Sequence, residues 1–447
     1  MKTETMWKTR KITMPPTPNS LVERSAGYKI PADYYVMLCI CALLTAAALI
    51  LDTPEQILRG LYKINTSRSV LITDYVALAG VGAALINSAF LLFLNILLLV
   101  LVKCNPSGRI IAALFLTIGF SLFGKNFFNT LPIMAGVFLH GRCSRIDPTE
   151  LAVLAMVSST MAPIVSEIAF LDESTSFAKI ILGLLAGLFA GFIFPTVTQY
   201  VKRMHSNFCL YNGGIAGGFI ATMFAGFFRS IGIEIIPENY WDTSHTLHLA
   251  ILIFTIAAAL IAYGLFADKP LIDIDKFRKL MNERDPEKPD YFAKYGTTCY
   301  INIGVMCILT TGVMLLMNIP INGPVLGGIL TVSGFAATGK HVKNTVPILI
   351  GSIAATHFNY MEATAPINIL AVLFSTGLAP IAGKYGWRWG IATGFLHVLI
   401  AVFIGDINGG LNLYNNGFAG SFVVIIIVPT IIYFRRIYVG TRKLWKR

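Results

Sequence analysis

The stretch GFSLFGKNFFNTLPIMAG at residues 119–136 occurs a second time, in altered form, as GFAATGKHVKNTVPILIG at residues 334–351. Nine of the eighteen positions are identical. Each copy places a lysine, Lys125 or Lys340, ahead of an Asn-Thr-x-Pro-Ile sequence and between two short apolar runs. Self-similarity at a fixed spacing is the sign of an internal duplication, so we expect the two copies to fold alike.

Further echoes appear in the same order in both halves of the chain. Asn87 and Asn302 precede the two copies at the same offset of 215 residues. STMAPI (159–164) corresponds to STGLAPI (375–381), with one residue inserted. LYNGGIAGGF (210–219) matches LYNNGFAGSF (413–422) at seven of ten positions. The order predicts two repeats, each consisting of a span, a hairpin and three further spans.

Composition places the chain in a membrane. Of its 447 residues, 55% are hydrophobic and 13% are charged, against about 25% charged in soluble domains. The mean hydropathy is +0.69. Ten runs are long enough to cross a bilayer, namely 34–51, 80–102, 149–171, 177–201, 208–230, 245–266, 297–318, 361–381, 386–407 and 411–434.

Four shorter apolar runs flank the duplicated motifs. Residues 110–123 and 127–140 flank the first motif, and residues 323–338 and 344–356 flank the second. Each run has about 14 residues, whereas a crossing helix needs about 20. We therefore predict an all-α integral membrane protein with about ten transmembrane helices and two re-entrant helical hairpins.

Loop charge predicts the relative orientation of the repeats. Cytoplasmic loops are enriched in Lys and Arg. The loop with Lys103 and Arg109 is basic, whereas its counterpart NIPING (318–323) has no charge; acidic LDES (171–174) corresponds to basic GKYGWRWG (383–390). An odd number of spans, five, separates equivalent helices. The repeats are therefore expected to be inverted, with both termini in the cytoplasm.

These observations divide the chain into six segments. They are a basic tail (1–33), a signal-anchor helix with an outer loop (34–79), repeat 1 (80–230), an extra span with a charged linker (231–296), repeat 2 (297–434) and a second basic tail (435–447). The net charge of +12 resides in tails and loops beside apolar runs. The positive-inside rule explains that placement, so no nucleic-acid partner is predicted.

Inverted repeats bring equivalent elements together near the middle of the bilayer, where transporters bind their solutes. The expected binding residues are polar members of the repeated motifs: Lys125, Asn129, Thr130, Lys340, Asn344, Thr345, Tyr211, Asn212, Tyr414 and Asn415. A lysine at the bilayer centre costs about 2.5–3.5 kcal/mol on insertion scales, which favours a functional role. The alternative is that the lysines are shallow and that Asn-Thr caps a helix.

Other residue types supply little chemistry. Glu167 and Asp406 are candidate ion-coupling carboxylates, but their places near span ends favour exposure. The seven cysteines have neither metal-ligand nor disulfide-framework spacing, so no metal or other cofactor is predicted. No paired acidic motif or Ser/His/Asp constellation is present, so a polytopic membrane enzyme is the third hypothesis, after a transporter and a channel. A structural or regulatory membrane protein is a further alternative, because sequence cannot demonstrate flux.

The motifs FGKNxxNTLPI, STxxAPI and NLYNNGFAG resemble those of a bacterial membrane family known as domain of unknown function 1576. That resemblance implies a multi-pass protein of the bacterial plasma membrane without an assigned activity. More weakly, NPSG (105–108) with LYNGG (210–214) resembles the urea-transporter family. This second resemblance implies two inverted halves and a channel for a small neutral solute.

The leading hypothesis is a transporter of a small polar solute, with the paired lysines favouring an anion or a carboxylate. Its site is expected between the two hairpin tips. The alternative is a passive, urea-channel-like pore. A small-molecule solute and the lipid bilayer are the expected partners, H⁺ and Na⁺ are the candidate coupling ions, and a homo-oligomer is a candidate assembly.

Overall fold

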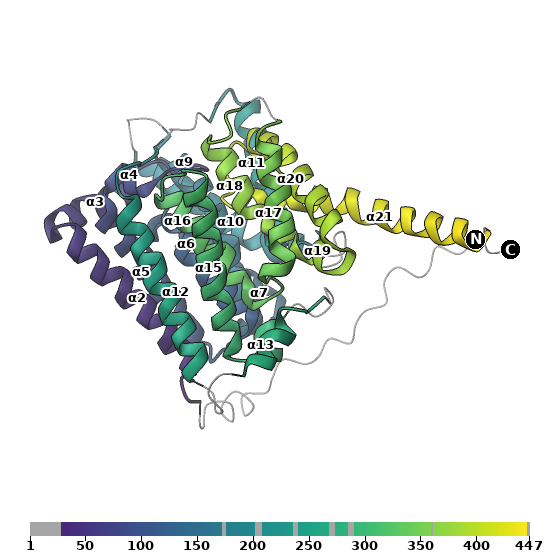
Figure 1. The fold of residues 1–447 in the computed structure, drawn as a ribbon. Coiled ribbons are helices and arrows are strands. Elements are labelled where there is room, and N and C mark those ends of the chain that lie inside the picture. The colour runs from purple at the N-terminus through teal and green to yellow at the C-terminus, as the bar shows by residue number, and fades with distance from the viewer. Residues whose placement is uncertain are drawn as a thin grey trace.

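The computed structural model describes residues 28–171, 176–201, 208–235, 240–267, 273–284, 290–358 and 361–444. These residues form an all-helical protein, and the only β-type pairing described among them is an isolated bridge between Thr73 and Tyr240. Figure 1 shows the helices in one bundle, from which the long C-terminal helix projects.

The first half contains helices α2 (Ala32–Leu51), α3 (Pro54–Thr66), α4 (Tyr75–Ala79), α5 (Val81–Leu101), α6 (Gly108–Phe120), α7 (Phe127–Ser144), α8 (Pro148–Ser158), η1 (Ser159–Met161), α9 (Pro163–Ala169), α10 (Phe177–Val201) and α11 (Gly213–Ser230). The second half contains α12 (Thr246–Phe266), α13 (Ile274–Leu280), α14 (Tyr291–Tyr295), α15 (Thr298–Leu316), α16 (Gly323–Gly334), η2 (Phe335–Ala337), α17 (Val342–Thr356), α18 (Pro366–Ser375), η3 (Thr376–Leu378), α19 (Ala379–Tyr385), α20 (Trp387–Asn408) and α21 (Asn415–Leu444).

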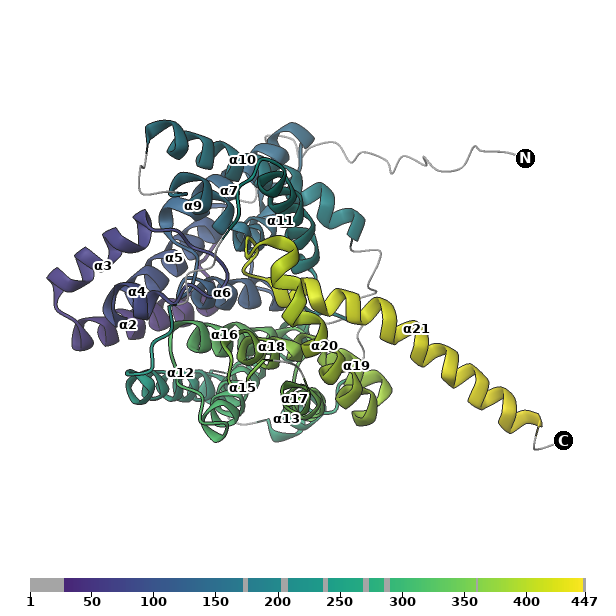
Figure 2. The ribbon, with the colours of Figure 1, turned by 90° about the horizontal axis from the view of Figure 1, so that it is seen from above.

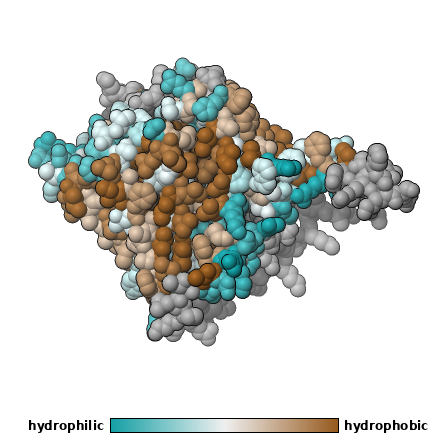
Figure 3. Space-filling model, viewed as in Figure 1, coloured by the Kyte–Doolittle hydropathy of each residue, from teal (hydrophilic) through white to brown (hydrophobic). Residues whose placement is uncertain are grey.

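Eight helices of the described residues are long and apolar enough to cross a membrane, and α8, η1 and α9 form a ninth candidate that bends by 44°. Together they match nine of the ten expected spans, and the tenth, 208–230, contains the 18-residue helix α11. Apolar residues cover the face formed by α12 and α15, with polar residues at its borders (Figure 3). The chain is therefore a multi-pass membrane protein.

Helices α6 and α16 lie side by side in the middle of the bundle (Figure 2). Each begins with a side-chain cap: Ser107 accepts from the backbone N–H of Ile110 and Asn322 from that of Val325. They pack closely at Gly119, where a Cβ would lie 2.0 Å from Thr331 Oγ1 and 2.2 Å from the carbonyl oxygen of Gly327.

The two central helices run in opposite directions. Gly108, which starts α6, packs against the carbonyl oxygen of Ala337, near the end of the α16 segment. Leu122, just past α6, packs against Gly323, which starts α16. The turn with Lys125 therefore lies at the end of the bundle that carries α4, here called the α4 end. The turn with Lys340 lies at the opposite, α13 end.

This arrangement differs from the expected hairpins, in which the two tips meet. The second arms pack elsewhere: α7 on α10, and α17 on α20. A Cβ on Gly136 would meet the backbone of Leu188 at 2.1 Å, and one on Gly351 would meet that of Ile391 at 1.9 Å. These glycines thus allow α7 to pack closely on α10 and α17 on α20, towards the periphery of the bundle.

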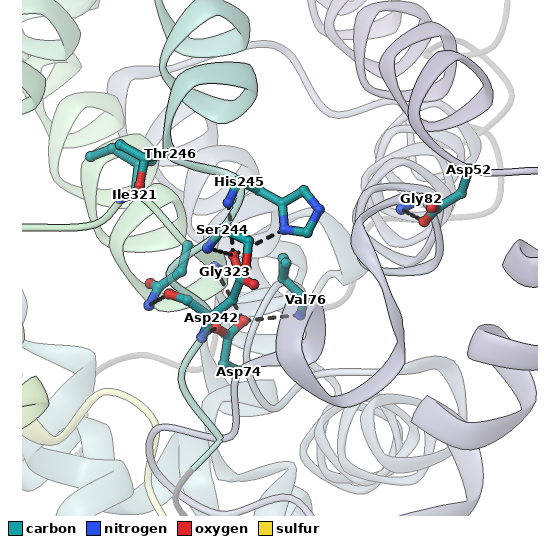
Figure 4. Close-up of polar contacts among 11 residues, drawn as sticks. Asp52, Asp74, Val76, Gly82, Asp242, Ser244, His245, Thr246, Ile321 and Gly323 are labelled. Atoms are coloured by element: carbon teal, nitrogen blue, oxygen red, sulfur yellow. Dashed lines mark hydrogen bonds and ion pairs between the residues drawn. The ribbon is translucent and has the colours of Figure 1, made fainter.

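A buried carboxylate joins the loops at the α4 end. Asp74 accepts hydrogen bonds from the backbone N–H groups of Val76 (2.9 Å), Asp242 (2.9 Å) and Gly323 (3.2 Å), as Figure 4 shows. Burial raises the pKa of Asp74 to about 6, and the backbone hydrogen bonds oppose that increase. Asp74 therefore ties α4, the start of α16 and the loop before α12 together.

Candidate functional site

The Asn-Thr pairs of the duplicated motifs stabilise the turns. Asn129 accepts from the backbone N–H of Asn126 (2.8 Å) and donates to the carbonyl of Gly124 (2.9 Å). Asn344 repeats both contacts, with His341 (2.9 Å) and Gly339 (3.0 Å). These are helix-capping contacts that satisfy backbone groups. Thr130 and Thr345 donate to the neighbouring Asn129 and Asn344.

Both lysines are fully buried, with 0% exposure. Lys340 Nζ donates to the hydroxyl of Tyr211, to Thr376 Oγ1 (2.8 Å) and to the Val332 carbonyl (3.1 Å). Its three N–H groups are thus satisfied. Lys125 Nζ makes one hydrogen bond to a described residue, the Met156 carbonyl at 3.3 Å. No carboxylate among the described residues forms an ion pair with either lysine.

The lysines lie on two sides of a buried aromatic cluster, which comprises Phe120, Tyr211, Phe335, Phe374 and Tyr414. Lys125 Nζ is 5.6 Å from the centre of the Phe120 ring, and Lys340 Nζ is 4.6 Å from that of Tyr211. The two tyrosine rings are 5.1 Å apart. The turns therefore lie at opposite ends of the bundle, but both ammonium groups reach inward to one central cluster.

The LYNxG motifs bring the two tyrosines together. They open α11 and α21, whose first turns cross so closely that a Cβ on Gly214 would lie 2.7 Å from the Cα of Gly417. Before the helices begin, the backbone N–H of Leu210 donates to Gly377 (2.9 Å) and that of Leu413 to Thr160 (2.9 Å). The LYNxG motifs thus place the N-termini of α11 and α21 inside the bundle.

A cavity of about 170 Å³ leads into this cluster. Arg109 of α6, which is exposed, and Thr338 line it towards the α13 end, whereas Phe335 and Tyr414 line it at the cluster. The Tyr414 hydroxyl is buried and has no hydrogen-bond partner among the described residues. A buried polar group without a partner is costly.

A second cavity, of about 590 Å³, lies near the α4 end. Arg229, Glu234 and Asp406 line it, together with Gly405. Beneath Gly405 lies Asn415, whose amide nitrogen is 3.7 Å from the Cβ position of that glycine. Asn212, the counterpart of Asn415, lines the first cavity. The two cavities therefore belong to opposite ends of the bundle, and residues of the aromatic cluster line the first of them.

Of the predicted site residues, the structure brings Lys125, Lys340, Tyr211 and Tyr414 to the cluster, and it places Asn212 and Asn415 beside the two cavities. Asn129, Thr130, Asn344 and Thr345 make the local capping contacts instead. Sequence reasoning missed Thr376 and Arg109. The repeated STxxAPI motif was a signal for Thr376, because it recurs as faithfully as the lysine motif.

The expected exposure of Glu167 is wrong. Its side chain has 0% exposure and pairs with Arg68, whose Nη2 is 2.7 Å from Oε2. The apolar surroundings of α9 bury the carboxylate, and Arg68, from the loop after α3, compensates its charge.

Comparisons with known proteins give a family but no activity. No curated protein and no solved structure matches the chain, so the weaker resemblance to urea transporters stays a prediction. Residues 53–230 and 272–432 match one family, described as "Protein of unknown function (DUF1576)". The two matched segments cover most of the chain and contain the site residues. The chain therefore belongs to this family of proteins of unknown function.

Proposed function

We propose that the protein transports a small anionic solute across the membrane and binds it at the aromatic cluster. The observation that carries the proposal is a cavity lined by Phe335 and Tyr414 of this cluster, where the buried Tyr414 hydroxyl has no partner among the described residues, together with a second cavity at the opposite end of the bundle. Alternating access requires a single site near the middle of the membrane that opens to one end of the bundle at a time.

Charge favours an anion. Among the described residues that line the first cavity, Arg109 is the only charged one. The first turns of α11 and α21 start at the cluster, and Lys125 makes a single hydrogen bond to a described residue. Helix N-termini and cations both favour negative charge. A cavity of about 150 Å³ can hold benzene, so one of about 170 Å³ suits a solute of comparable size.

In this proposal the two halves act as inverted repeats, and they differ in the hydrogen bonds that their lysines make. Under the sequence correspondence, the counterparts of Tyr211 and Thr376 around Lys340 are Tyr414 and Thr160 around Lys125. Tyr414 has no hydrogen-bond partner among the described residues, and the hydrogen bond of Lys125 goes to the Met156 carbonyl rather than to Thr160. The threonines themselves are alike, because Thr160 donates to Val157 (2.9 Å) as Thr376 does to Leu373 (2.7 Å). In the opposite state, Lys125 would bind Tyr414 and Thr160, and Lys340 would release its partners.

Uptake into proteoliposomes tests the proposal. The probes are radiolabelled formate, acetate, lactate and succinate, with urea as the neutral probe. We expect saturable uptake of at least one anion, and we expect Tyr414→Phe to reduce it while Tyr62→Phe, at an exposed position on α3, leaves it unchanged. Uptake of no anion above that of empty vesicles would reject the transporter, and wild-type uptake by Tyr414→Phe would reject the site.

Counterflow separates the transporter from the passive channel. A carrier preloaded with unlabelled solute accumulates labelled solute transiently above equilibrium, because one site alternates between the two sides. A pore cannot do so. Urea flux that is linear in concentration and lacks counterflow would favour the channel.

A further inference from the structure

A third cavity lies at the α13 end, away from the aromatic cluster. It has a volume of about 370 Å³, and we call it the basic basin. Four parts of the chain line it: the segment after α13 (Met281–Arg284), the start of α17, the turn from α19 to α20, and Arg435 of α21. Segments that are far apart in the sequence thus meet around one depression.

Positive charge dominates the lining. Among the described residues, its cationic side chains are Arg284, Lys343, Lys384 and Arg435, all exposed to solvent, and its carboxylate is that of Glu283. That carboxylate already forms an ion pair with Lys294, and it accepts from the Tyr295 hydroxyl at 2.9 Å.

Three of these cations contact neutral groups of the described residues. Lys343 Nζ donates to the neutral side chain of Asn282 (2.8 Å), and Arg435 Nη2 to the carbonyl of Tyr385 (3.3 Å). Lys384 Nζ lies 5.4 Å from the centre of the Phe208 ring. These neutral partners orient the cations without cancelling their charge.

The backbone adds to the positive potential. Gly386 is the N-cap of the 22-residue helix α20, with φ of +102° and no side-chain cap. A Cβ at Gly386 would meet nothing within 4 Å, and both Gly386 and Trp387 line the basin. The first N–H groups of α20 are therefore available beside the four cations, as in anion sites at helix starts.

We propose that the basic basin binds the phosphate group of an organic phosphate or of a phospholipid headgroup. A phosphate monoester carries about −1.5 to −2 charges at neutral pH, which suits several converging cations better than a monocarboxylate does. A phospholipid diester carries less charge but offers the same phosphate oxygens to the cations. Arginine matches phosphate oxygens with two parallel hydrogen bonds, and the basin has Arg284 and Arg435. The exposed Trp387 (60%) at its rim is typical of a membrane interface.

The site is independent of solute transport, and its test is binding to the full-length protein. The protein is reconstituted in phosphatidylcholine nanodiscs, and two probes are used: glycerol 3-phosphate in solution, measured by calorimetry, and phosphatidylglycerol, measured by native mass spectrometry. The test variant is Arg284→Gln/Lys384→Gln. The control variant, Arg278→Gln/Arg388→Gln, removes the same charge from neighbouring exposed positions that do not line the basin.

We expect at least one probe to bind to the wild-type protein. Its affinity should fall about tenfold or more in the test variant, because two charge-assisted contacts are lost. The affinity of the control variant should stay within about twofold of wild type. Binding of the soluble probe alone identifies a free organic phosphate, and binding of the lipid alone identifies a headgroup; both support the site. Failure of both probes to bind, or equal losses in the two variants, would overturn it. Matching thermal midpoints of the variants exclude misfolding as the cause.

Discussion

Replacing each buried lysine by methionine tests the asymmetry of the two halves. Methionine is close to lysine in length and apolar, so each substitution removes hydrogen bonds and charge with little loss of volume. Lys340 donates three hydrogen bonds to described residues, whereas Lys125 donates one. The cost of burying an ammonium group is common to both positions and cancels in the comparison.

Interhelical hydrogen bonds in membranes contribute about 0.6 kcal/mol on average and up to about 1.7 kcal/mol. Two additional bonds therefore correspond to about 1–3 kcal/mol. We expect Lys340→Met to lower the free energy of unfolding by that much more than Lys125→Met does. Tyr211 also loses its donor in the first variant, which adds to the difference.

The assay is reversible unfolding in mixed micelles with increasing dodecyl sulfate, followed by circular dichroism. Lys63→Met, at an exposed position on α3, serves as the surface control and is expected to change the free energy by less than about 0.5 kcal/mol. Equal destabilisation by the two buried substitutions, or a greater effect of Lys125→Met, would refute the assignment of Lys340 as the satisfied lysine.

Three further predictions use the same protein. The pKa of Asp74 is raised to about 6, above its unfolded value, so the free energy of unfolding should fall by about 2–3 kcal/mol as the pH rises from about 4 to about 6. Asp74→Asn should flatten this pH dependence. An unchanged slope in the variant would contradict the role of Asp74. Gly119→Val should destabilise the α6–α16 crossing by about 1–3 kcal/mol or more, measured by dodecyl sulfate unfolding, whereas Gly312→Ala, where a Cβ meets nothing within 4 Å, should be neutral or stabilising. In a chain whose other cysteines are replaced by alanine, the exposed native Cys143 and a Glu234→Cys variant should react with impermeant thiol reagents from opposite sides of the membrane; labelling from the same side would refute the topology.

Several features of the fold could be predicted from particular sequence patterns. Apolar run lengths located nine spans within a few residues, because a helix must satisfy its own backbone within a bilayer. The repeat of Gly, Lys and Asn-Thr predicted that the two motif segments would fold alike. Asn87 and Asn302 illustrate this: their amides donate to the Lys125 carbonyl (2.8 Å) and to the Lys340 carbonyl (2.7 Å).

The sequence also led to two errors of position. Runs of about 14 residues suggested re-entrant tips that meet, because run length alone cannot tell a tip from a short helix covered by loops. Glu167 was expected to be exposed because it lies near the end of a run. Its burial depends on Arg68, which is 99 residues away along the chain.

Composition, run length and internal repetition determined by themselves that this is a duplicated, multi-pass membrane protein with lysines at equivalent points. These properties are local or periodic, so a one-dimensional pattern contains them. Only the tertiary structure decided three further properties: both lysines reach one aromatic cluster, Lys340 is satisfied whereas Tyr414 has no partner among the described residues, and cavities lie towards both ends of the bundle. These properties depend on side chains from separate helices meeting in space, and small shifts in packing change them without changing the pattern.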